Sequence, residues 1–490
     1  MPAIITNKFR IHNSEQFLES FGEASPNIYY LGIGRPQPFQ TQTRGDLRTV
    51  NQGTDVAPIT PYDNVSEEFY VYDDLLAAKK ITQSDTSYVI PRRNWTTGTV
   101  YDIYRHDYGS RITGTTTTLT SNSGATNLFD ATFYVLTTDR NIYKCINNNN
   151  NSVSTVEPTG TSVNIITTAD GYKWKYMYTL SASQQANFLS TDFMAVSTNS
   201  IVSSSSTDGS IHNVLIKSSG TGSIVNGTFT NIPIRGDGSS GEVTVIVDGG
   251  TVTSVTVTNI GTGYTFAYIR NSDIVSSGAT AISGVEIDCI IEPKGGHGFN
   301  AIQELGGFFV MLNVNLEGTE TANTGDFTAE NDFRKIVLFR DIYSGGALAS
   351  STTLNATKAI KIASSPTPGT FQIDEKITQS TTGAVGKVVE WDSINGILYY
   401  IQTRFNDEGI DSNGNLTQFS GSNVITGSTS SATGTPSSAA SETVDQITFT
   451  NGYKESELDQ DKGDVLYIEN RSPITRAPDQ TENIKLVIEF

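Results

Sequence analysis

Short stretches in which apolar residues alternate with polar ones recur along the chain, and this period of two is typical of half-buried β-strands. The last stretch has four apolar residues at every second position, namely Ile484, Leu486, Ile488 and Phe490. Chain ends usually fray unless a strand or helix holds them. We therefore interpret residues 484–490 as the closing strand of a domain that begins near residue 1.

A second stretch alternates large residues at every second position: Tyr172, Trp174, Tyr176, Tyr178 and Leu180. One interpretation is a stacking platform for a sugar or for single-stranded nucleic acid. The other is one face of a sheet turned toward a core. The strict alternation and the acidic net charge favour the core face. The intervening lysines, Lys173 and Lys175, then point to the other side, where an acidic neighbour can meet them.

Further strands are predicted at residues 27–33, 335–339 and 465–468 by the same criteria. Hairpins are predicted over 133–146, with a turn at 138–140, and over 242–258 and 387–401, where Gly-containing turns separate two β-rich runs. Two stretches have helical spacing instead. Residues 14–21 predict a short helix capped by Ser14, and residues 66–81 predict the clearest helix, capped by Ser66 with acidic residues first and lysines last.

The domain organisation follows from length and from shifts in composition. A chain of 490 residues is too long for one hydrophobic core. We predict a multidomain, mainly β protein with some α (an α+β framework), with nested insertions and both termini in the same domain. The predicted parts are a base domain (1–100 plus 446–490, with 291–345 returning to the framework), a β-rich middle domain (101–200), a Gly/Ser/Thr-rich inserted β module (201–290) and a second inserted module (346–445).

Composition agrees with many short strands and excludes some functions. Only 17% of residues are charged, and Ser, Thr, Asn and 44 glycines take much of the remaining space. The net charge of −19 argues against a general binder of nucleic acid or anionic membranes, because like charges repel. No run approaches the roughly 20 apolar residues of a membrane span, and the N-terminal residues lack the apolar core of a secretory signal. We expect a protein made in a cytoplasm.

Several motifs invite a chemical interpretation that their surroundings do not support. Cys145 and Cys289 are too few for a disulfide scaffold or a zinc site. His297, in Gly-Gly-His-Gly, lacks metal-ligand spacing and is expected in a turn. Residues 411–422 faintly resemble a calcium loop, but Leu416 and Ser422 stand where that loop needs Gly and Glu.

Other motifs are equally weak. Arg-Gly-Asp occurs at 44–46 and 235–237, and we interpret both as turn composition. A pair of catalytic carboxylates cannot be seen from spacing, since the required separation is spatial. We predict no catalytic residue, no metal and no cofactor, and hence no enzyme.

Arg92 and Arg93 stand beside Trp95 in a proline-stiffened stretch. They can clamp an anion or carboxylate, or they can form a structural or subunit-interface ion pair. We favour the interface, because no phosphate-binding glycine loop lies nearby. Gly32-Ile33-Gly34 lacks the third glycine of such a motif.

Six stretches, taken together and in order, resemble the baseplate wedge protein of T-even-like contractile-tailed bacteriophages. They are TNKFR (6–10), GIGRP (32–36), VIPRRNW (89–95), DGYKWKYMYTL (170–180), DFRKIVLFRD (332–341) and GDVLYIENRSPITRAPDQTENIKLVIEF (463–490). The resemblance spans both ends of the chain. Residues 201–290 and 346–445 then look like additions to the family framework.

The resemblance implies a structural subunit of the virion tail baseplate, assembled in the host cytoplasm. It implies a homodimer in each wedge, packed against other wedge subunits, that takes part in the rearrangement triggering sheath contraction. The resemblance assigns no partner to the insertions; a tail fibre or a neighbouring wedge is our own hypothesis for what they contact. No nucleic acid or membrane partner is implied. The residues we assign to an interface or structural motif are Arg92, Arg93, Trp95, Trp174, Tyr176, Asn470, Arg471 and Pro473.

The alternative is a receptor- or glycan-binding tail protein that uses the inserted modules. Trp391, Tyr399 and Tyr400 would then stack on sugar, unless they form the small core of their module. A polysaccharide-degrading spike comes third, and it requires clustered carboxylates.

Overall fold

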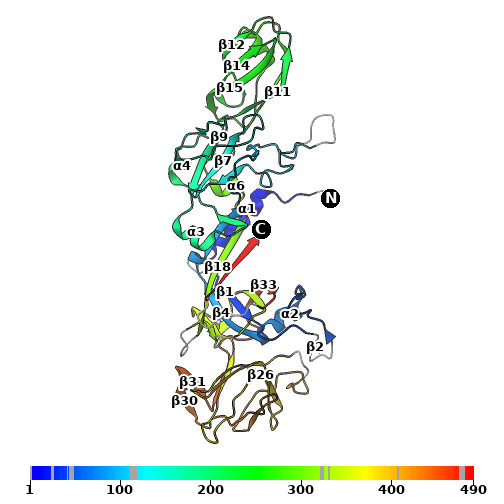
Figure 1. The fold of residues 1–490 in the computed structure, drawn as a ribbon, viewed down its shortest axis with the longest axis vertical. Helices are drawn as coiled ribbons and strands as arrows, with labels where there is room; N and C mark the ends of the chain where they lie inside the picture. The colour runs from blue at the N-terminus through cyan, green and yellow to red at the C-terminus, as the bar shows by residue number, and fades with distance from the viewer. Residues whose placement is uncertain are drawn as a thin grey trace. The chain divides into compact units, whose positions relative to one another are not determined.

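The computed structural model describes residues 3–23, 27–40, 42–43, 49–110, 118–319, 325–328, 331–404, 408–473 and 481–490. Within these ranges the regular structure is mainly short β-strands in several sheets, and the helices are few and short (Figure 1). The mainly β class is therefore confirmed. No helix among the described residues is long and apolar enough to cross a membrane.

The chain packs into two compact units. Unit 1 consists of Met1–Gln16, Ser87–Met311 and Val487–Phe490, and unit 2 of Phe17–Thr86 and Leu312–Leu486. Both termini therefore belong to unit 1. The division falls within β18 (Phe309–Thr319) and β34 (Thr481–Glu489). These units follow packing whereas the predicted boundaries follow composition, so the four-part organisation stays a prediction.

One part of unit 1 is built on the antiparallel sheet β6-β7-β9-β8. Its strands are β6 (Tyr134–Leu136), β7 (Asn141–Asn147), β9 (Lys173–Thr179) and β8 (Ile166–Thr167). The hairpin predicted at 133–146 and the aromatic strand are confirmed. Trp174 is fully buried and stacks on Tyr172 at 5.4 Å between ring centroids. These aromatic residues are core residues, as predicted, but they do not form one face. A register shift after Tyr176 places Tyr178 and Leu180 in a different hydrophobic cluster from Trp174.

Beside this sheet, unit 1 holds β5 (Thr86–Pro91), which pairs with β10 (Phe193–Ala195), and the helices α3 (Ala182–Phe188), α4 (Ser200–Ser204) and α6 (Ala301–Leu305). A core cluster that includes Val89, Phe133, Tyr178 and Met194 fills the space between them. The sequence of residues 89–95 allows a strand or a turn, and the structure forms strand β5 up to Pro91.

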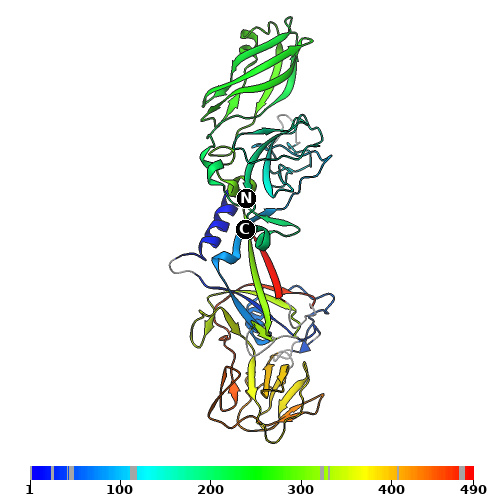
Figure 2. The same ribbon diagram turned by 60° about the vertical axis from the view of Figure 1, so that its left-hand side comes forward.

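Residues 214–289 form a two-sheet module inside unit 1, whose long strands run side by side in Figure 2. One sheet is β11 (Val214–Thr221), β17 (Ser283–Cys289), β16 (Ala267–Tyr268) and β13 (Arg235–Gly236), and the other is β12 (Gly227–Pro233), β14 (Ser239–Asp248) and β15 (Thr251–Thr262), with α5 (Asn271–Ser276). Valines and isoleucines such as Val245 and Ile287 form its core. The predicted hairpin turns at Gly249 and Gly250, whose positive φ angles of 57° and 79° suit a tight β-hairpin.

The Arg-Gly-Asp sequence in this module is used internally. Arg235 donates two hydrogen bonds to Asp273 at 2.9 and 3.0 Å. Asp237 accepts from the hydroxyl and the N–H of Thr265 at 2.6 and 2.9 Å. This geometry agrees with turn composition. The copy at 44–46 lies outside the described residues.

The first helix differs from the prediction. α1 spans Asn7–Glu19, and the Thr6 hydroxyl accepts from the Phe9 N–H at 3.3 Å at its start. Ser14 is therefore not the cap. It is buried within the helix, where its hydroxyl donates to the carbonyls of Ile11 at 2.7 Å and Gly307 at 2.9 Å. The hydrogen bond to Gly307, rather than helix capping, explains why a serine stands at this buried position.

Unit 2 contains an antiparallel sheet in the order β23-β4-β1-β20-β33. Its strands are β23 (Thr353–Asn355), β4 (Leu75–Ile81), β1 (Tyr29–Gly34), β20 (Lys335–Arg340) and β33 (Asp464–Asn470). The strands predicted at 27–33, 335–339 and 465–468 are confirmed. Every residue of β1 is buried, as suits a central strand covered on both faces.

The helix predicted over 66–81 is wrong for most of its length. A short α2 (Val65–Tyr70) capped by Asn64, rather than Ser66, is followed by a 3-10 turn (Val71–Asp74) and then by strand β4. β4 pairs with both β1 and β23, and its first four residues are buried. Sheet hydrogen bonds and two-sided burial outweigh a helix propensity of a few tenths of a kcal/mol per residue.

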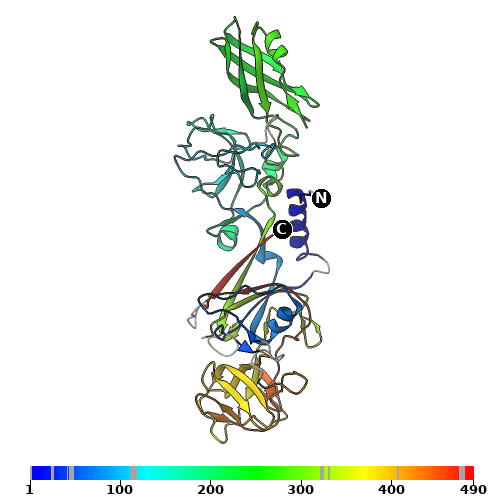
Figure 3. The same cartoon turned by 90° about the vertical axis from the view of Figure 1, so that its right-hand side faces the viewer.

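The second module of unit 2 is a nine-stranded sheet (Figure 3, yellow to orange) in the order β29-β28-β25-β26-β27-β24-β32-β31-β30. Its strands are β24 (Lys358–Lys361), β25 (Lys376–Gln379), β26 (Ala384–Asp392), β27 (Ile397–Ile401), β28 (Ile425–Gly427), β29 (Thr433–Gly434), β30 (Ser441–Val444), β31 (Ile447–Thr450) and β32 (Tyr453–Lys454). The hairpin predicted over 387–401 is confirmed. Short strands elsewhere in unit 2 are β2 (Gln42–Thr43), β3 (Thr49–Val50), β19 (Phe327–Thr328), β21 (Tyr343–Ser344) and β22 (Ala347–Leu348).

The two glycines of β1 have a packing role. A methyl group on Gly32 would lie 2.7 Å from Cε2 of the Phe339 ring. One on Gly34 would lie 2.6 Å from the Asp74 carbonyl oxygen and 2.8 Å from Cα of Leu75. Close approach of β4 and of a phenylalanine explains the Gly-x-Gly pattern without any bound phosphate.

We expect Gly34→Ala to destabilise the protein more than Gly32→Ala. At Gly34 the added methyl group meets backbone atoms, which cannot move without breaking the sheet, whereas at Gly32 it meets a ring that can shift. Overpacking of this kind costs about 1–3 kcal/mol. Urea unfolding of the full chain, followed by circular dichroism, measures both variants. An equal or larger loss for Gly32→Ala contradicts this reading of β1.

The last residues are held inside unit 1. The Phe490 N–H donates to the Phe308 carbonyl at 3.1 Å. The Arg10 guanidinium contacts the Phe490 carbonyl and the Glu489 carboxylate, and it lies 3.7 Å from the centre of the Phe308 ring. The C-terminal strand therefore contacts residues from the beginning of the chain.

Deletion of Val487–Phe490 should lower the thermal stability of unit 1. The deletion removes the hydrogen-bond partners of Arg10 and the packing of Val487 against the core. We expect a fall in melting temperature and a faster proteolytic cleavage of residues 3–16. Glu489→Gln is the matched control, since it leaves the strand in place and removes only a partly exposed ion pair. Equal melting temperatures for the truncated and full chains would exclude a closing role for this strand.

Candidate functional site

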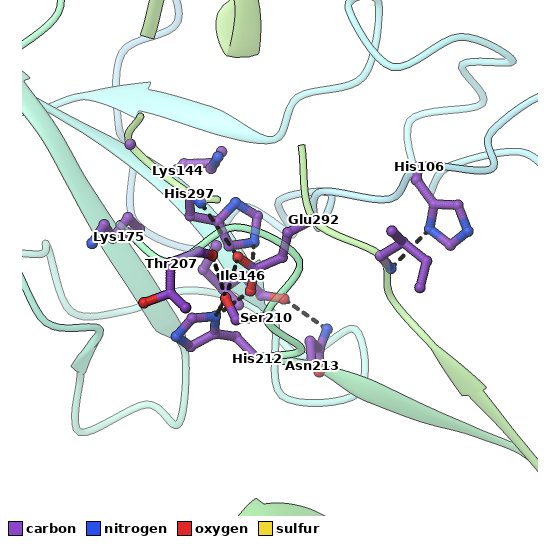
Figure 4. Close-up of polar contacts among 12 residues, drawn as sticks. His106, Lys144, Ile146, Lys175, Thr207, Ser210, His212, Asn213, Glu292 and His297 are labelled. Atoms are coloured by element: carbon purple, nitrogen blue, oxygen red, sulfur yellow. Dashed lines mark hydrogen bonds and ion pairs between the residues drawn. The ribbon is translucent and has the colours of Figure 1, made fainter. Parts of the chain in front are cut away.

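Six ionisable side chains meet inside unit 1, and five of them are labelled in Figure 4. They are Lys144 of β7, Lys175 of β9, His212, Glu292, His297 and Glu304 of α6. Five of the six residues are at least nine-tenths buried, and His212 is the more exposed member. A buried charge is costly unless it is paired. These buried charges therefore require the contacts that pair them.

The cluster begins with two lysines that face each other. Lys144 on β7 and Lys175 on β9 are directly opposite in the sheet. Like charges in opposite positions destabilise a strand pair, and more so when both are buried. The segment 292–304 supplies the two carboxylates that offset these charges.

Glu304 satisfies Lys144. Its carboxylate forms an ion pair with the Lys144 ammonium, which also lies 5.1 Å from the centre of the Tyr104 ring. The same carboxylate accepts from the N–H groups of Gly298 at 2.9 Å and Asn300 at 3.1 Å. Lys175 donates to the Val163 carbonyl at 2.5 Å.

Glu292 is the centre of the second half of the cluster. The Ser210 hydroxyl donates to it at 2.8 Å and the His297 N–H at 3.3 Å. The His212 ring contacts the same carboxylate through Nδ1, and His297 Nε2 lies 3.6 Å away. One carboxylate thus joins the 207–212 loop to the 295–298 turn.

The turn that carries His297 requires its glycines. Gly295, Gly296 and Gly298 have φ angles of 88°, 90° and 93°, which side chains rarely adopt. A methyl group on Gly296 would also lie 2.4 Å from the Thr207 carbonyl oxygen. The prediction of a turn histidine is confirmed, although the histidine is buried, with its ring edge-on to Tyr104 at 5.0 Å.

The geometry does not form a nucleophile relay. The Ser210 hydroxyl donates a hydrogen bond to Glu292. It also approaches His212, but only at the Nδ1 that already faces the same carboxylate. A relay needs the hydroxyl on one ring nitrogen and the carboxylate on the other. Among the described residues, no group of three or more His, Cys, Asp or Glu side chains is arranged to hold a metal ion. We call this cluster the charged joint, because its hydrogen bonds link the 207–212 loop to the 295–298 turn.

Burial sets the protonation of this joint. The pKa of His297 is lowered well below its usual value, first by burial and then by the charges of Lys144, His212 and Lys175. Burial and Lys144 also lower the pKa of Lys175. His297 is hence neutral in the folded protein, and its Nδ1 has no hydrogen-bond partner within the described residues.

Acidification should destabilise unit 1 through His297. Below about pH 6.5 the unfolded chain binds a proton that the folded chain does not, so the stability falls by up to about 1.4 kcal/mol per pH unit. His106, whose pKa is also lowered by burial, adds to the same trend. Most carboxylates titrate near pH 4, so the window from pH 6.5 to 5 reports the histidines.

The measurement is urea unfolding of the full chain at several pH values in a Trp391→Phe background, where the remaining fluorescence comes from Trp95 and Trp174 of unit 1. His297→Gln should reduce the pH slope by the share of one histidine, about 2 kcal/mol between pH 6.5 and 5. The absolute stability of the variant does not matter for this comparison. The same slope in both proteins would show that His297 is already protonated or accessible.

Arg92, Arg93 and Trp95 lie together in unit 1, and all three are bonded within the chain. Arg92 donates to the Ser190 carbonyl at 2.8 Å, and Arg93 to the Phe129 carbonyl at 2.9 Å and to that of Ala131. Trp95 donates to the Ser154 hydroxyl at 3.1 Å. Arg92 also donates to the Asn94 side-chain oxygen at 3.0 Å. Within the described residues, the hydrogen-bond partners of these three side chains are carbonyl oxygens, one amide oxygen and a hydroxyl, and none is a carboxylate.

Trp174 and Tyr176 are core residues of β9 and share a hydrophobic cluster with Trp95. The structure thus brings five of the eight predicted residues into one part of unit 1. The other three belong to unit 2. Asn470 donates to the Ile59 carbonyl at 2.9 Å, the Arg471 N–H donates to the Arg334 carbonyl at 2.8 Å, and Pro473 is half-buried. The rest of this hook, 474–480, lies outside the described residues. An interface role for these eight residues stays a prediction.

The aromatic residues of the second module are mostly internal. Tyr400 is buried in the module core, Tyr399 is 6% exposed, and Trp391 packs against Phe371 at 5.3 Å between ring centroids. This packing favours the core interpretation. Asp411 accepts from the N–H groups of Asn413 and Asn415, as in a plain turn. Cys145 and Cys289 are free and buried, and burial raises the pKa of Cys289 to about 12.

Residues 3–148 match the family Phage-Gp8, described as bacteriophage T4, Gp8. The match covers less than a third of the chain and includes α1, β1, β4 and the stretch from Arg92 to Trp95. Among curated proteins, none matches the chain. The match supports a T4-like baseplate wedge protein, with a structural role in the phage tail baseplate and a location in the virion.

The sequence interpretation missed the charged cluster. Lys144 was the available signal, because a lysine stands in the apolar run Ile142–Ile146 of a predicted strand. Its partner Glu304 is 160 residues away in the chain, and spacing alone cannot connect them. His297 was noticed, but without Glu292 it was only a turn residue.

Proposed function

We propose that the protein is a structural subunit of a bacteriophage tail baseplate wedge, that it assembles as a homodimer with other wedge subunits, and that it takes part in the rearrangement that triggers sheath contraction. The observation that carries this proposal is the match of residues 3–148 to the Gp8 family. The remaining two-thirds of the chain contribute β modules whose partners, a tail fibre or a neighbouring wedge, belong to the same proposal.

The interior of unit 1 supports a scaffold role. The matched region holds α1, the Arg92–Trp95 stretch and Lys144. Arg92 and Arg93 donate to four main-chain carbonyls, which ties the end of β5 to the segments near 130 and 190. Such cross-links between main-chain segments suit a surface that has to keep its shape while its neighbours move.

The charged cluster supports a non-enzymatic role. Ser210, His212 and the two carboxylates are hydrogen-bonded to one another or to the main chain, and the ring of His297 is buried beside Tyr104. Groups that are committed in this way position loops, and they leave no poised base beside a substrate cavity. We propose that the protein works by assembly.

Two measurements test this proposal. The purified protein should have twice the mass of the 52.9 kDa chain in solution, since homodimer interfaces are commonly isologous. Arg92→Ala combined with Arg93→Ala should lower both the thermal stability and the incorporation into wedges, because partly buried main-chain carbonyls lose their donors.

Arg270→Ala is the matched control, because within the described residues this side chain donates to the hydroxyl of Tyr268, which is exposed. The control should assemble normally. A monomer in solution would contradict the dimeric part of the proposal. Normal stability and assembly of the double variant would remove Arg92 and Arg93 from it.

A further inference from the structure

A cavity of about 310 Å³ lies in unit 1, away from the charged cluster. Three loops or strands surround it: residues 103–108, residues 119–122, and the asparagine-rich segment 147–151, with Leu215 and Ile216 of β11 closing one wall. Its size is at the lower end of the range for small-ligand pockets, which is roughly 300–1,000 Å³. None of the interpretations above assigns it a role.

The backbone beside this cavity is unusual. Asn149, Asn150 and Asn151 have φ angles of 48°, 54° and 63°, so three successive residues other than glycine adopt the left-handed conformation. Asparagine tolerates this conformation better than most residues, but mainly as single residues. Strain of this kind persists only where the surroundings impose it, and it concentrates at functional sites.

The neighbouring amides hold this backbone in place. Asn147 accepts from the Asn149 N–H at 2.9 Å, and Asn148 from the Asn151 N–H at 3.1 Å. The Asn151 side-chain oxygen accepts from the amides of Asn148 at 2.9 Å and Asn122 at 2.7 Å. These side-chain amides therefore hold the backbone of residues 147–151 in its conformation.

Two polar side chains on the cavity wall have no hydrogen-bond partner among the described residues. The Asn150 amide and the Thr120 hydroxyl make no hydrogen bond within the part of the chain that the structure describes. Both side chains are exposed. A preorganised loop with unused donors and acceptors is what recognition of a small polar molecule requires.

The wall chemistry selects a neutral, hydroxyl-rich ligand. Arg105 is the one charged residue among those that line the cavity, and its guanidinium is bound by Asp107 at 2.8 Å and Asp288 at 3.3 Å. An anion would therefore gain little. Amides and hydroxyls offer both donors and acceptors, as sugar hydroxyls do. Ile103, Leu119 and Leu215 give an apolar wall for the C–H face of a sugar ring.

We propose that this cavity binds one residue of a neutral saccharide, with the Asn150 amide and the Thr120 hydroxyl as direct ligand contacts. The site is separate from the aromatic residues of the second module and does not depend on the baseplate proposal. It adds a ligand to a protein whose other surfaces serve assembly.

The test uses the full chain. A glycan array, followed by calorimetric titration with glucose, galactose, mannose and N-acetylglucosamine, should find saturable binding of at least one neutral sugar. Asn150→Gly keeps the left-handed backbone allowed and removes the side chain, so it should weaken binding at least tenfold at an unchanged melting temperature. Thr120→Val should also weaken it.

Asn231→Gly is the matched control, because Asn231 is exposed, has a φ of 59° and does not line the cavity. It should bind as the unmodified protein does. Three outcomes overturn the proposal: no sugar binds, binding is the same in Asn150→Gly, or inorganic phosphate binds at the cavity and displaces the sugar. Asn150→Gly should leave the mass in solution unchanged, which separates failure here from failure of the dimer.

Discussion

The opposition of two buried lysines is the constraint on which unit 1 depends. Lys144 and Lys175 face each other across β7 and β9 in a sheet whose other side chains form an aromatic core. The effective cost of burying a single ion is several kcal/mol, and removal of one partner from a buried pair costs about 3–5 kcal/mol. The strands can therefore pair in this register only when Glu304 and Glu292 are brought to them.

This requirement explains the segment that follows residue 291. The glycines around His297 make a turn that lets the main chain approach the Thr207 carbonyl, while Glu304 pairs with Lys144 and Glu292 with His212. The cluster contributes little net stability, because desolvation offsets most of the attraction. What it contributes is specificity, since any other placement of this segment leaves charges unpaired.

A scaffold role and a ligand cavity are compatible in one protein. The match over residues 3–148 places the scaffold interpretation on the same region that supplies Lys144, the arginine cross-links and much of the wall of the cavity. Lys144, the two arginines and the cavity wall all lie in parts of the chain that are held by several hydrogen bonds. A loop with three left-handed asparagines can persist only on such a support.

Periodicity by itself determined a minority of the strands of the described chain, among them β1, β9, β20, the β14–β15 hairpin and β34, because a period of two survives wherever one face is buried. It also determined that the aromatic residues of β9 are core residues, although an irregularity in the strand pairing places Tyr178 in a different cluster from Trp174 and Tyr176. Tertiary structure alone decided the rest. β4 has a helix-compatible sequence, and only its two strand neighbours make it a strand. Ser14 has the identity of a cap, but the Gly307 carbonyl makes it a buried contact. The charged joint unites Lys144 with Glu304 and His212 with Glu292, and the cavity unites Asn150 with Thr120 and Leu215. These pairs are far apart in sequence, and a single sequence carries no record of which distant side chains must neutralise or face one another.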